Sequence, residues 1–174
     1  MKNIFIINGS ASENSSNHKI IENFISSTSL YFTCTFFDKL KTLPHFSPEL
    51  SIENTPQEIL DFRTKIQNAD GIIICTPEYI FSIPSGLKNA LEWCVSTTIF
   101  EGKPVGIITA SANGEKGHEE LQLIMKTLMT TFNEETTLLI QGVKGKVNSE
   151  GKIIDNETLQ QVENFTKAYQ SSIK

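Results

Sequence analysis

A run of serine and asparagine residues near the start of the chain has the composition of an anion-binding loop. Residues 8–17 read NGSASENSSN and hold four serines and three asparagines around Gly9. Hydroxyl and amide donors, a glycine that permits close approach and the positive end of a following helix are what a phosphate monoester requires. The run matches neither the P-loop pattern GxxxxGK(S/T) nor the dinucleotide pattern GxGxxG. A solvated loop that caps a helix is the simpler alternative.

A second segment has the residues to build a rigid wall beside a flat ring. Residues 76–93 read TPEYIFSIPSGLKNALEW, with the aromatic ring of Tyr79 between Pro77 and Pro84. Proline fixes the backbone, and an aromatic side chain beside free backbone amides suits a planar heterocycle. A third, shorter segment, ASANGEKG, occupies residues 110–117. Any functional claim about this chain has to be tested in these three segments.

Five apolar runs alternate with five amphipathic segments, so each of the three segments follows a strand. Branched apolar runs predict buried strands, and apolar residues three or four apart predict helices. We expect Thr55 to cap the second helix, with Pro56 as its first residue. The connection 38–54 is expected to be irregular, and residues 142–156 to form a surface loop or hairpin. The expected strands are 4–7, 31–37, 71–75, 105–109 and 137–140, and the expected helices include 20–25, 56–69, 84–97, 121–132 and 159–173.

This alternation predicts an α/β fold in which helices cover both faces of a parallel sheet. With five strands, the leading arrangement is a flavodoxin-like three-layer sandwich with strand order 2-1-3-4-5, in one domain of residues 1–174. Ligands of such sheets bind at the carboxyl ends of the strands, near the point where the strand order reverses. The three segments are expected at that edge.

Composition excludes several classes of function. The net charge of -5 provides no clustered positive charge for a nucleic acid. The three cysteines are unclustered, which indicates reduced thiols rather than disulfides or a zinc site. His18 and His45 have no ligand-spaced neighbours, so no metal site is expected. Because no apolar run approaches the roughly 18 residues of a membrane span, we expect a soluble, cytoplasmic protein that does not act at a membrane.

Two of the segments resemble the motifs of the NADPH-dependent FMN reductase family, which includes quinone, azo and chromate reductases. Residues 77–93 resemble its signature PEYxxSxPxxLKNAxxW, and the serine-rich run is similar to its phosphate loop GSxRxxSxN. The resemblance extends from the first strand to about Leu128. The matching phosphate-loop positions are Gly9, Ser10, Ser15 and Asn17, and the strand lead-in Ala69, Asp70, Gly71 also fits.

The resemblance implies an enzyme that binds FMN noncovalently, as a homodimer or homotetramer, with residues around Trp93 facing the partner subunit. NADPH or NADH would pass hydride to flavin N5, and a quinone, azo, flavin or metal-oxyanion acceptor would then take the electrons. No side chain of the protein need act as a nucleophile. By similarity, the phosphate would be held by Ser10, Ser12, Ser15, Ser16 and Asn17, and the flavin ring would be lined by Pro77, Glu78, Tyr79, Ile80 and Ser111.

Three positions depart from the family pattern. Ser12 replaces the phosphate-loop arginine, which lowers the expected FMN affinity by about one to two orders of magnitude unless Lys19 or backbone amides compensate. Ile80 replaces an asparagine, so only its backbone would contact flavin. Lys116, Gly117 and His118 replace a Gly-Gly turn, which affects the expected site for a nicotinamide phosphate.

Other interpretations stay open at this point. A flavodoxin-like electron carrier would share the fold and FMN, and a cofactor-free regulatory module would be colourless. His118 would touch a phosphate or an acceptor, or else be an exposed residue at the start of a helix. Trp93 would anchor a dimer interface or pack within the chain. Glu78 is interpreted as a loop residue used through its backbone rather than as a general base.

Overall fold

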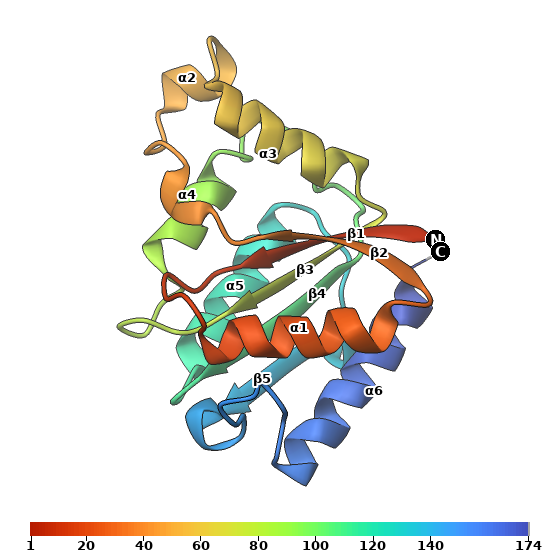
Figure 1. The fold of residues 1–174 in the computed structure, drawn as a ribbon. Coiled ribbons are helices and arrows are strands. Elements are labelled where there is room, and N and C mark those ends of the chain that lie inside the picture. Colours follow the sequence, from red (N-terminus) through yellow and green to blue (C-terminus); the bar gives the residue numbers. More distant parts are fainter. Residues whose placement is uncertain (174) are drawn as a thin grey trace.

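Five parallel strands form one sheet in the computed structural model, which describes residues 1–173 (Figure 1). The order is β2-β1-β3-β4-β5, which confirms the predicted 2-1-3-4-5 arrangement. Lys174, the last residue of the predicted domain, lies outside the described residues. The strands are β1 (Lys2–Asn8), β2 (Phe32–Phe37), β3 (Gly71–Thr76), β4 (Val105–Ser111) and β5 (Thr137–Gln141).

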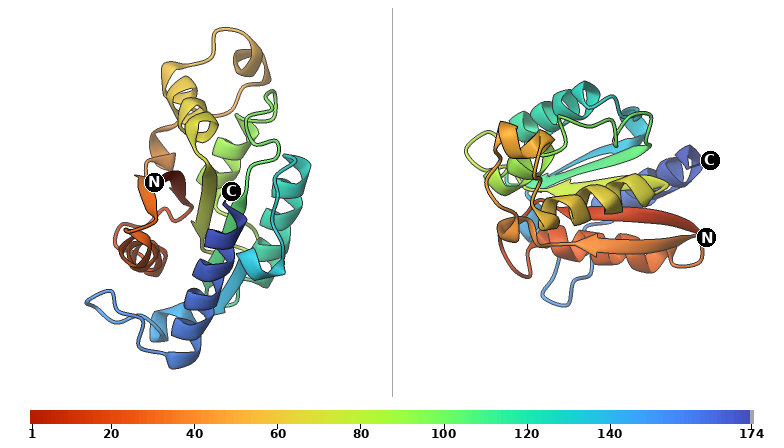
Figure 2. Two further views of the ribbon diagram at one scale, coloured as in Figure 1. Left: turned by 90° about the vertical axis from the view of Figure 1, so that its right-hand side faces the viewer. Right: turned by 90° about the horizontal axis from the view of Figure 1, so that it is seen from above.

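Helices cover both faces of the sheet and complete the three layers (Figure 2). One face packs against α1 (Ser16–Thr28) and α6 (Asn156–Ser172). The opposite face packs against α3 (Gln57–Asn68), α4 (Ser85–Glu92) and α5 (Glu115–Thr127). Because the sheet is covered on both sides, the central strand β3 is buried at every position, as its unbroken apolar run predicts.

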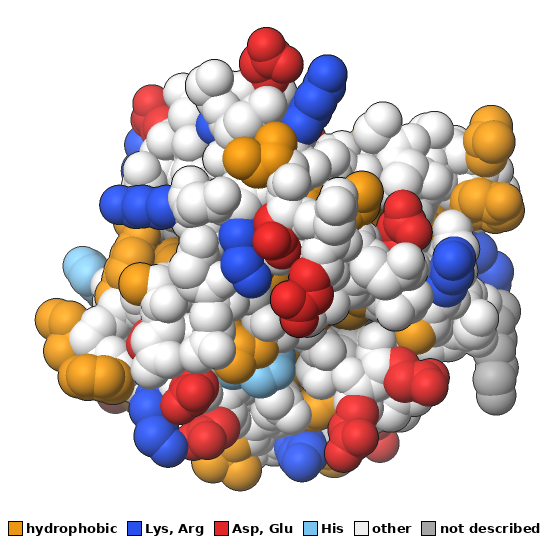
Figure 3. Space-filling view, turned by 90° about the horizontal axis from the view of Figure 1, so that it is seen from below, with side chains coloured by type: hydrophobic (Ala, Val, Ile, Leu, Met, Phe, Trp, Pro, Cys, Tyr) orange, Lys and Arg blue, Asp and Glu red, His pale blue; other side chains and the backbone are white. Residues whose placement is uncertain are grey.

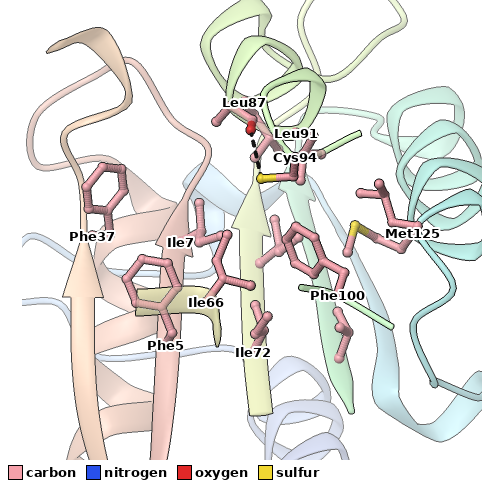
Figure 4. Packing of buried hydrophobic residues seen from close by; sticks show 14 of the residues in the cluster. Phe5, Ile7, Phe37, Ile66, Ile72, Leu87, Leu91, Cys94, Phe100 and Met125 are labelled. Carbon is pink, nitrogen blue, oxygen red and sulfur yellow. Dashed lines mark hydrogen bonds between the residues drawn. The ribbon is translucent and has the colours of Figure 1, made fainter. Parts of the chain in front are cut away.

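The core on the α3–α5 face shows how the sheet fixes the helices that carry the loops. In Figure 4, Ile7 and Ile72 of the strands, Leu87 and Leu91 of α4 and Met125 of α5 belong to one cluster of buried side chains. All five side chains are at most 1% exposed. Burying a side chain of this size contributes roughly 1.5–3 kcal/mol to the free energy of unfolding. The loops at the strand ends therefore extend from a tightly packed core.

The connection between β2 and α3 is more regular than expected. A 3-10 helix (Leu40–Thr42) and a short helix, α2 (Pro48–Ile52), interrupt it. The α2 helix forms because Ser47 Oγ accepts the Leu50 N–H and proline occupies its first turn. The prediction that Thr55 caps α3 was wrong. Its hydroxyl instead donates to the Leu50 carbonyl, which leaves Pro56 in the cap position.

Helix α4 ends at Glu92, five residues before the apolar spacing predicts. Arg63, the only arginine of the sequence, explains this end. Its guanidinium donates to the carbonyls of Trp93 and Ser51, so the positive charge satisfies the end of α4 and fastens it to α2. Helix α5 similarly stops before Met129, whose φ of 61° cannot continue a right-handed helix.

The segment between β5 and α6 contains a hairpin, one of the two outcomes expected for it. A 3-10 helix (Val143–Gly145) follows β5, and an antiparallel bridge pairs Val147 with Ile153. Val143 and Val147 are buried in the core shared with α1 and α6. These two anchors hold the hairpin against the body of the protein.

Cys75 and Cys94 are buried free thiols, and Cys34 is a half-buried one. Burial raises the pKa of Cys94 to about 12 and raises that of Cys75 further, so both remain protonated and unreactive at neutral pH. Among residues 1–173, no three histidine, cysteine or acidic side chains gather as metal ligands. No helix in this part of the chain combines the length and hydropathy needed to cross a bilayer.

Candidate functional site

A cavity of about 560 Å³ opens at the carboxyl ends of the strands, which point to the left in Figure 1. Its volume falls within the roughly 300–1,000 Å³ of small-molecule sites. Four loops form its walls, and they follow β1, β3, β4 and β5. Its lining consists of Ser10, Ser12, Asn14, Ser15, Ser16, Asn17, Pro77, Tyr79, Ala110, Ser111, Ala112, Gly142, Val143 and Lys144.

Side-chain hydrogen bonds fold the loop after β1 back on itself. Asn8 Oδ1 accepts the Ser10 N–H at 3.1 Å, and Ser10 Oγ accepts the Ser12 N–H at 3.2 Å. The Gly9 N–H donates to the Cys75 carbonyl at 2.8 Å, which ties this loop to the end of β3. These short local bonds are the reason that Ser and Asn favour turns over helix. They leave the Ser10 hydroxyl hydrogen free to donate into the cavity.

The N-terminus of α1 presents further donors to the same cavity. Ser15 is the N-cap, and its Oγ accepts the His18 N–H at 3.2 Å, which leaves its own hydrogen free. Within residues 1–173, the N–H groups of Ser16 and Asn17 have no hydrogen-bond acceptor. The first turn of α1 contains no acidic residue. This end of the helix is therefore suited to an anion.

The Asn17 side chain acts inside the protein rather than at its surface. Its amide donates to the Ala110 carbonyl at 3.0 Å, and the thiol of Cys75 donates to its Oδ1. Asn17 is only 3% exposed. It therefore holds the first turn of α1 against the ends of β3 and β4, which positions the donors beside it.

Glu78 joins the loop after β3 to the start of α5. One carboxylate oxygen accepts the Gly114 N–H at 3.2 Å, and the other accepts the Gly117 N–H at 2.8 Å. A second contact joins α5 to this loop, because the Glu120 carboxylate of α5 accepts hydrogen bonds from the Ser82 hydroxyl and the Ile83 N–H. The loop is thus fixed at both ends by charge-assisted bonds. Because backbone N–H groups occupy both of its oxygens, Glu78 is a positioning residue.

A strained two-residue turn forms the tip of the same loop. Tyr79 and Ser82 exchange backbone hydrogen bonds, and Ile80 and Phe81 between them have φ values of 50° and 59°. Such turns require a left-handed backbone at both central residues, which asparagine and glycine adopt readily and branched residues do not. The Ile80 side chain is 95% exposed and makes no compensating packing. The loop projects beyond the strand ends in Figure 1.

We expect the substitution Ile80→Asn to raise the free energy of unfolding by about 1 kcal/mol, because it relieves left-handed strain without removing buried surface. Urea denaturation followed by circular dichroism measures the change. Ile80→Val is the matched control, since valine keeps the branch at Cβ and should leave stability near that of the wild type. An Ile80→Asn variant no more stable than Ile80→Val would contradict the strain argument.

A second cavity, of about 370 Å³, adjoins the first across Ser10 and Tyr79. The connection after β2 forms its outer wall, and α4 holds that wall in place. Asn89 donates to the Pro44 carbonyl and accepts the Phe46 N–H, and the Trp93 indole also donates to Pro44. Trp93 has no exposed surface. Of the two sequence interpretations of Trp93, packing within the chain is correct, and a role as an interface anchor is wrong.

His118 lies behind the site instead of facing it. It lines neither cavity, and its Nδ1 is 2.8 Å from the Thr109 hydroxyl. The expectation of an exposed residue at the start of a helix was wrong, because His118 is half-buried and joins α5 to β4. A contact of its side chain with a phosphate or an acceptor stays a prediction. Burial lowers its pKa, and the nearby Glu119 offsets this only in part.

The lowered pKa of His118 predicts a pH dependence of stability. In the window below its unfolded pKa of about 6.5, the unfolded chain binds a proton that the folded protein resists, so the free energy of unfolding falls as the pH falls. Urea titrations at pH 7.5 and 5.5 measure this. His118→Gln should flatten the dependence, and His45→Gln, at an exposed position, should preserve it. If the free energy of unfolding of His118→Gln depended on pH as strongly as that of the wild type, His118 would not be the group responsible.

Eight of the ten residues expected to bind a cofactor meet at the first cavity. Glu78 and Ile80 do not line it, because the Glu78 carboxylate binds the N–H groups of Gly114 and Gly117 and Ile80 is exposed to solvent. Lys19, expected as a substitute for the missing arginine, is directed elsewhere, since its ammonium donates to the carbonyls of Asn148 and Ser149. The loop after β5, with Lys144, was missed. Its signal was available, because in a parallel sheet the end of β5 must border the same edge.

The first cavity is suited to a phosphate ester attached to a planar group. It offers hydroxyl and backbone N–H donors at one end and Pro77 with the Tyr79 ring at the other, and no carboxylate lines it. The second cavity includes Asp38, and its Lys41 is already paired with Glu13 at 3.1 Å. Acidic and basic side chains are interspersed over the face seen in Figure 3. The affinity for an anion must therefore come from local donors.

Comparisons with known proteins identify a family and several similar chains. Residues 2–141 match the family described as NADPH-dependent FMN reductase. The chain is 30% identical over 138 residues to the NADH:(hydroxy)cinnamate reductase subunit CrdA of Vibrio ruber, covering 75% of this chain and 67% of the relative. It is 25% identical to a 2-hydroxy-1,4-benzoquinone reductase of Burkholderia, covering 98% and 96%. In fold it is similar to FerB, a flavoenzyme NAD(P)H:(acceptor) oxidoreductase of Paracoccus denitrificans, with TM-score 0.84, 22% identity, and 99% and 97% coverage.

Proposed function

Because the chain belongs to the NADPH-dependent FMN reductase family, we propose that it binds FMN in the first cavity and transfers electrons from NAD(P)H to a small quinone-like acceptor. Membership makes the chain an FMN-dependent oxidoreductase that uses NAD(P)H. The observation that carries the choice of cavity is the set of free donors at the N-terminus of α1, next to Tyr79. Relatives named as quinone reductases support the acceptor class.

The residues of the first cavity fit the phosphate end of FMN. The hydroxyl groups of Ser10 and Ser15 have hydrogens free to donate, and the N–H groups of Ser16 and Asn17 lack acceptors within the described chain. Four such donors can bond the three terminal oxygens of a phosphate without any change in the fold. Ser12 lines the same cavity, and its hydroxyl donates to the Glu13 carbonyl at 3.3 Å.

The residues at the ring end of the cavity would position the flavin ring and would not react with the substrate themselves. Pro77 and Tyr79 would flank the flavin ring, and Ser111 stands beside them with its Oγ 3.3 Å from the Glu78 N–H. Bound FMN would supply the redox chemistry between NAD(P)H and the acceptor. The protein's share is to hold the ring in one orientation and to keep loop amides directed at it.

The test is the visible absorption spectrum of the purified protein incubated with FMN and passed through a desalting column. We expect retained FMN that bleaches under anaerobic NADPH or NADH and recovers its colour when benzoquinone is added. Retained FMN that resists both nucleotides would favour an electron carrier. A folded protein that retains no FMN would overturn the proposal and favour a cofactor-free module.

The same proposal includes a homodimer or homotetramer, as the family resemblance implies. Light scattering of the FMN-loaded protein should give at least twice the chain mass of 19.4 kDa. A mass equal to one chain at micromolar concentration would overturn this part of the proposal and leave the cofactor assignment standing.

A further inference from the structure

One cationic side chain borders the proposed FMN cavity, and it comes from the loop that sequence analysis overlooked. Lys144 lies in the 3-10 helix after β5 and is the only charged residue among those that line the cavity. The remaining lining residues are neutral. A cavity with several neutral donors, one ammonium and no carboxylate is matched to an anion rather than to a neutral ligand.

The backbone around Lys144 is fixed to the cavity at two points. The Gly142 N–H donates to the Ala112 carbonyl at 3.0 Å, which joins this loop to the one after β4. Val143 is buried at 5% exposure in the core beneath α1 and α6. Gly142 has a φ of 62°, a left-handed conformation that glycine adopts without strain and that starts the 3-10 turn. Lys144 therefore leaves the backbone from a defined position.

The hairpin that follows Lys144 is fastened to α1, the helix that carries the phosphate donors. The Lys19 ammonium donates to the Asn148 carbonyl at 3.0 Å, and the Asn23 amide donates to the Gly151 carbonyl at 2.7 Å. These bonds hold the hairpin and the first turns of α1 side by side. They also commit the charge of Lys19 to the hairpin, so that Lys19 cannot replace an arginine in the phosphate loop.

Lys144 forms no ion pair with a carboxylate of the described residues. Within residues 1–173, no acidic side chain is in ion-pair distance of it, whereas Lys146 pairs with Asp155 and Lys152 pairs with Glu150 on the same hairpin. An unpaired ammonium at the wall of a cavity is available for an anionic ligand. Salt would screen it, as for any exposed charge.

We propose that Lys144 supplies the positive charge for the FMN phosphate in place of the loop arginine replaced by Ser12, and so makes the site select FMN over riboflavin. This inference rests on the proposed function. It assigns the formally charged contact with the phosphate to one residue of the β5 loop, in addition to the neutral hydroxyl donors of Ser10 and Ser15 and the partial positive charge at the α1 N-terminus. A charge-assisted hydrogen bond of this kind is expected to change FMN affinity by about tenfold or more.

The experiment compares the binding of FMN and of riboflavin by quenching of flavin fluorescence, in the wild type and in Lys144→Gln. We expect the FMN dissociation constant to rise about tenfold in Lys144→Gln and the riboflavin constant to stay unchanged. Lys144→Arg should retain FMN affinity. Lys152→Gln, on the same hairpin but outside the cavity lining, is the matched control and should bind both flavins as the wild type does.

A rescue experiment tests the link to Ser12. The double variant Ser12→Arg/Lys144→Gln should regain the FMN affinity that Lys144→Gln loses, because the arginine restores a cation at the phosphate end. An unchanged ratio of FMN to riboflavin affinity in Lys144→Gln would overturn the inference and leave the proposed function intact. Equal weakening of both flavins would also overturn it, since that indicates damage to the loop. A wild type that binds neither flavin would overturn the proposed function itself.

Discussion

Replacement of Gly9 by alanine is expected to lower the free energy of unfolding by about 3 kcal/mol and to abolish FMN retention. A Cβ at position 9 would lie 2.3 Å from Thr76 Oγ1 and 2.6 Å from Thr76 Cβ. Thr76 is completely buried, and the Gly9 N–H is bonded to the Cys75 carbonyl. Neither the Thr76 side chain nor the Gly9 backbone can therefore move away to make room for a Cβ. The loops after β1 and β3 would be forced apart, which separates the phosphate donors from Tyr79.

Gly86→Ala is the matched control for this prediction. The nearest atom to a Cβ at position 86 is Leu40 Cβ at 3.6 Å, an ordinary contact, and the residue lies in the first turn of α4. Alanine there should raise stability by up to about 1 kcal/mol, because it lowers the entropy of the unfolded chain. Urea denaturation and FMN retention on a desalting column are measured for both variants. A Gly9→Ala variant that equals Gly86→Ala in both would refute the close-approach argument.

Glu78→Gln is expected to lower the free energy of unfolding by about 2 kcal/mol and to weaken FMN binding by about tenfold. A glutamine keeps the size of the side chain but has one acceptor oxygen, so it cannot accept both the Gly114 and Gly117 N–H groups. It also removes the negative charge at the N-terminus of α5. The connection between the loops after β3 and β4, which line the cavity together, would then be weakened.

Kinetics distinguish this positioning role from acid-base catalysis. At saturating FMN, Glu78→Gln should turn over NAD(P)H at close to the wild-type rate, because the defect lies in binding. A general base would show the opposite pattern, with normal FMN affinity and a turnover lowered by about two orders of magnitude. Glu119→Gln, which loses only an exposed ion pair with Lys116, is the control and should be near neutral in both measurements.

Much of the architecture could be predicted from the sequence because it depends on local pattern. The run from Gly71 to Cys75 has three isoleucines and no polar residue, so it has no polar face to expose and must be a buried strand. Five such alternations with helices leave few topologies, and the handedness of parallel crossovers favours the one observed. The positions of the serine-rich and proline-rich loops at one edge follow from the same parallel order.

The interpretation of several single residues required the tertiary structure. Periodicity places Trp93 on a helix but cannot show that Pro44, far away in the chain, accepts its indole N–H. The position of His118 at the start of a helix cannot show that it contacts Thr109, because Thr109 belongs to another element. The early end of α4 depends on Arg63, which is contributed by α3. Each of these contacts joins residues from different elements, which come together only when the elements pack. A local sequence pattern therefore cannot predict it.

The sequence by itself determined the strand order, the edge of the sheet at which the candidate site lies and the family motifs, because apolar periodicity and loop chemistry are properties of contiguous residues. Only the tertiary structure decided which side chains work together there. It showed that the Glu78 carboxylate binds backbone N–H groups at the start of α5, that the Lys19 ammonium binds the hairpin and that Lys144 lines the cavity. Electrostatic and hydrogen-bond partnerships act over a few ångströms in space, and distance along the chain does not limit them.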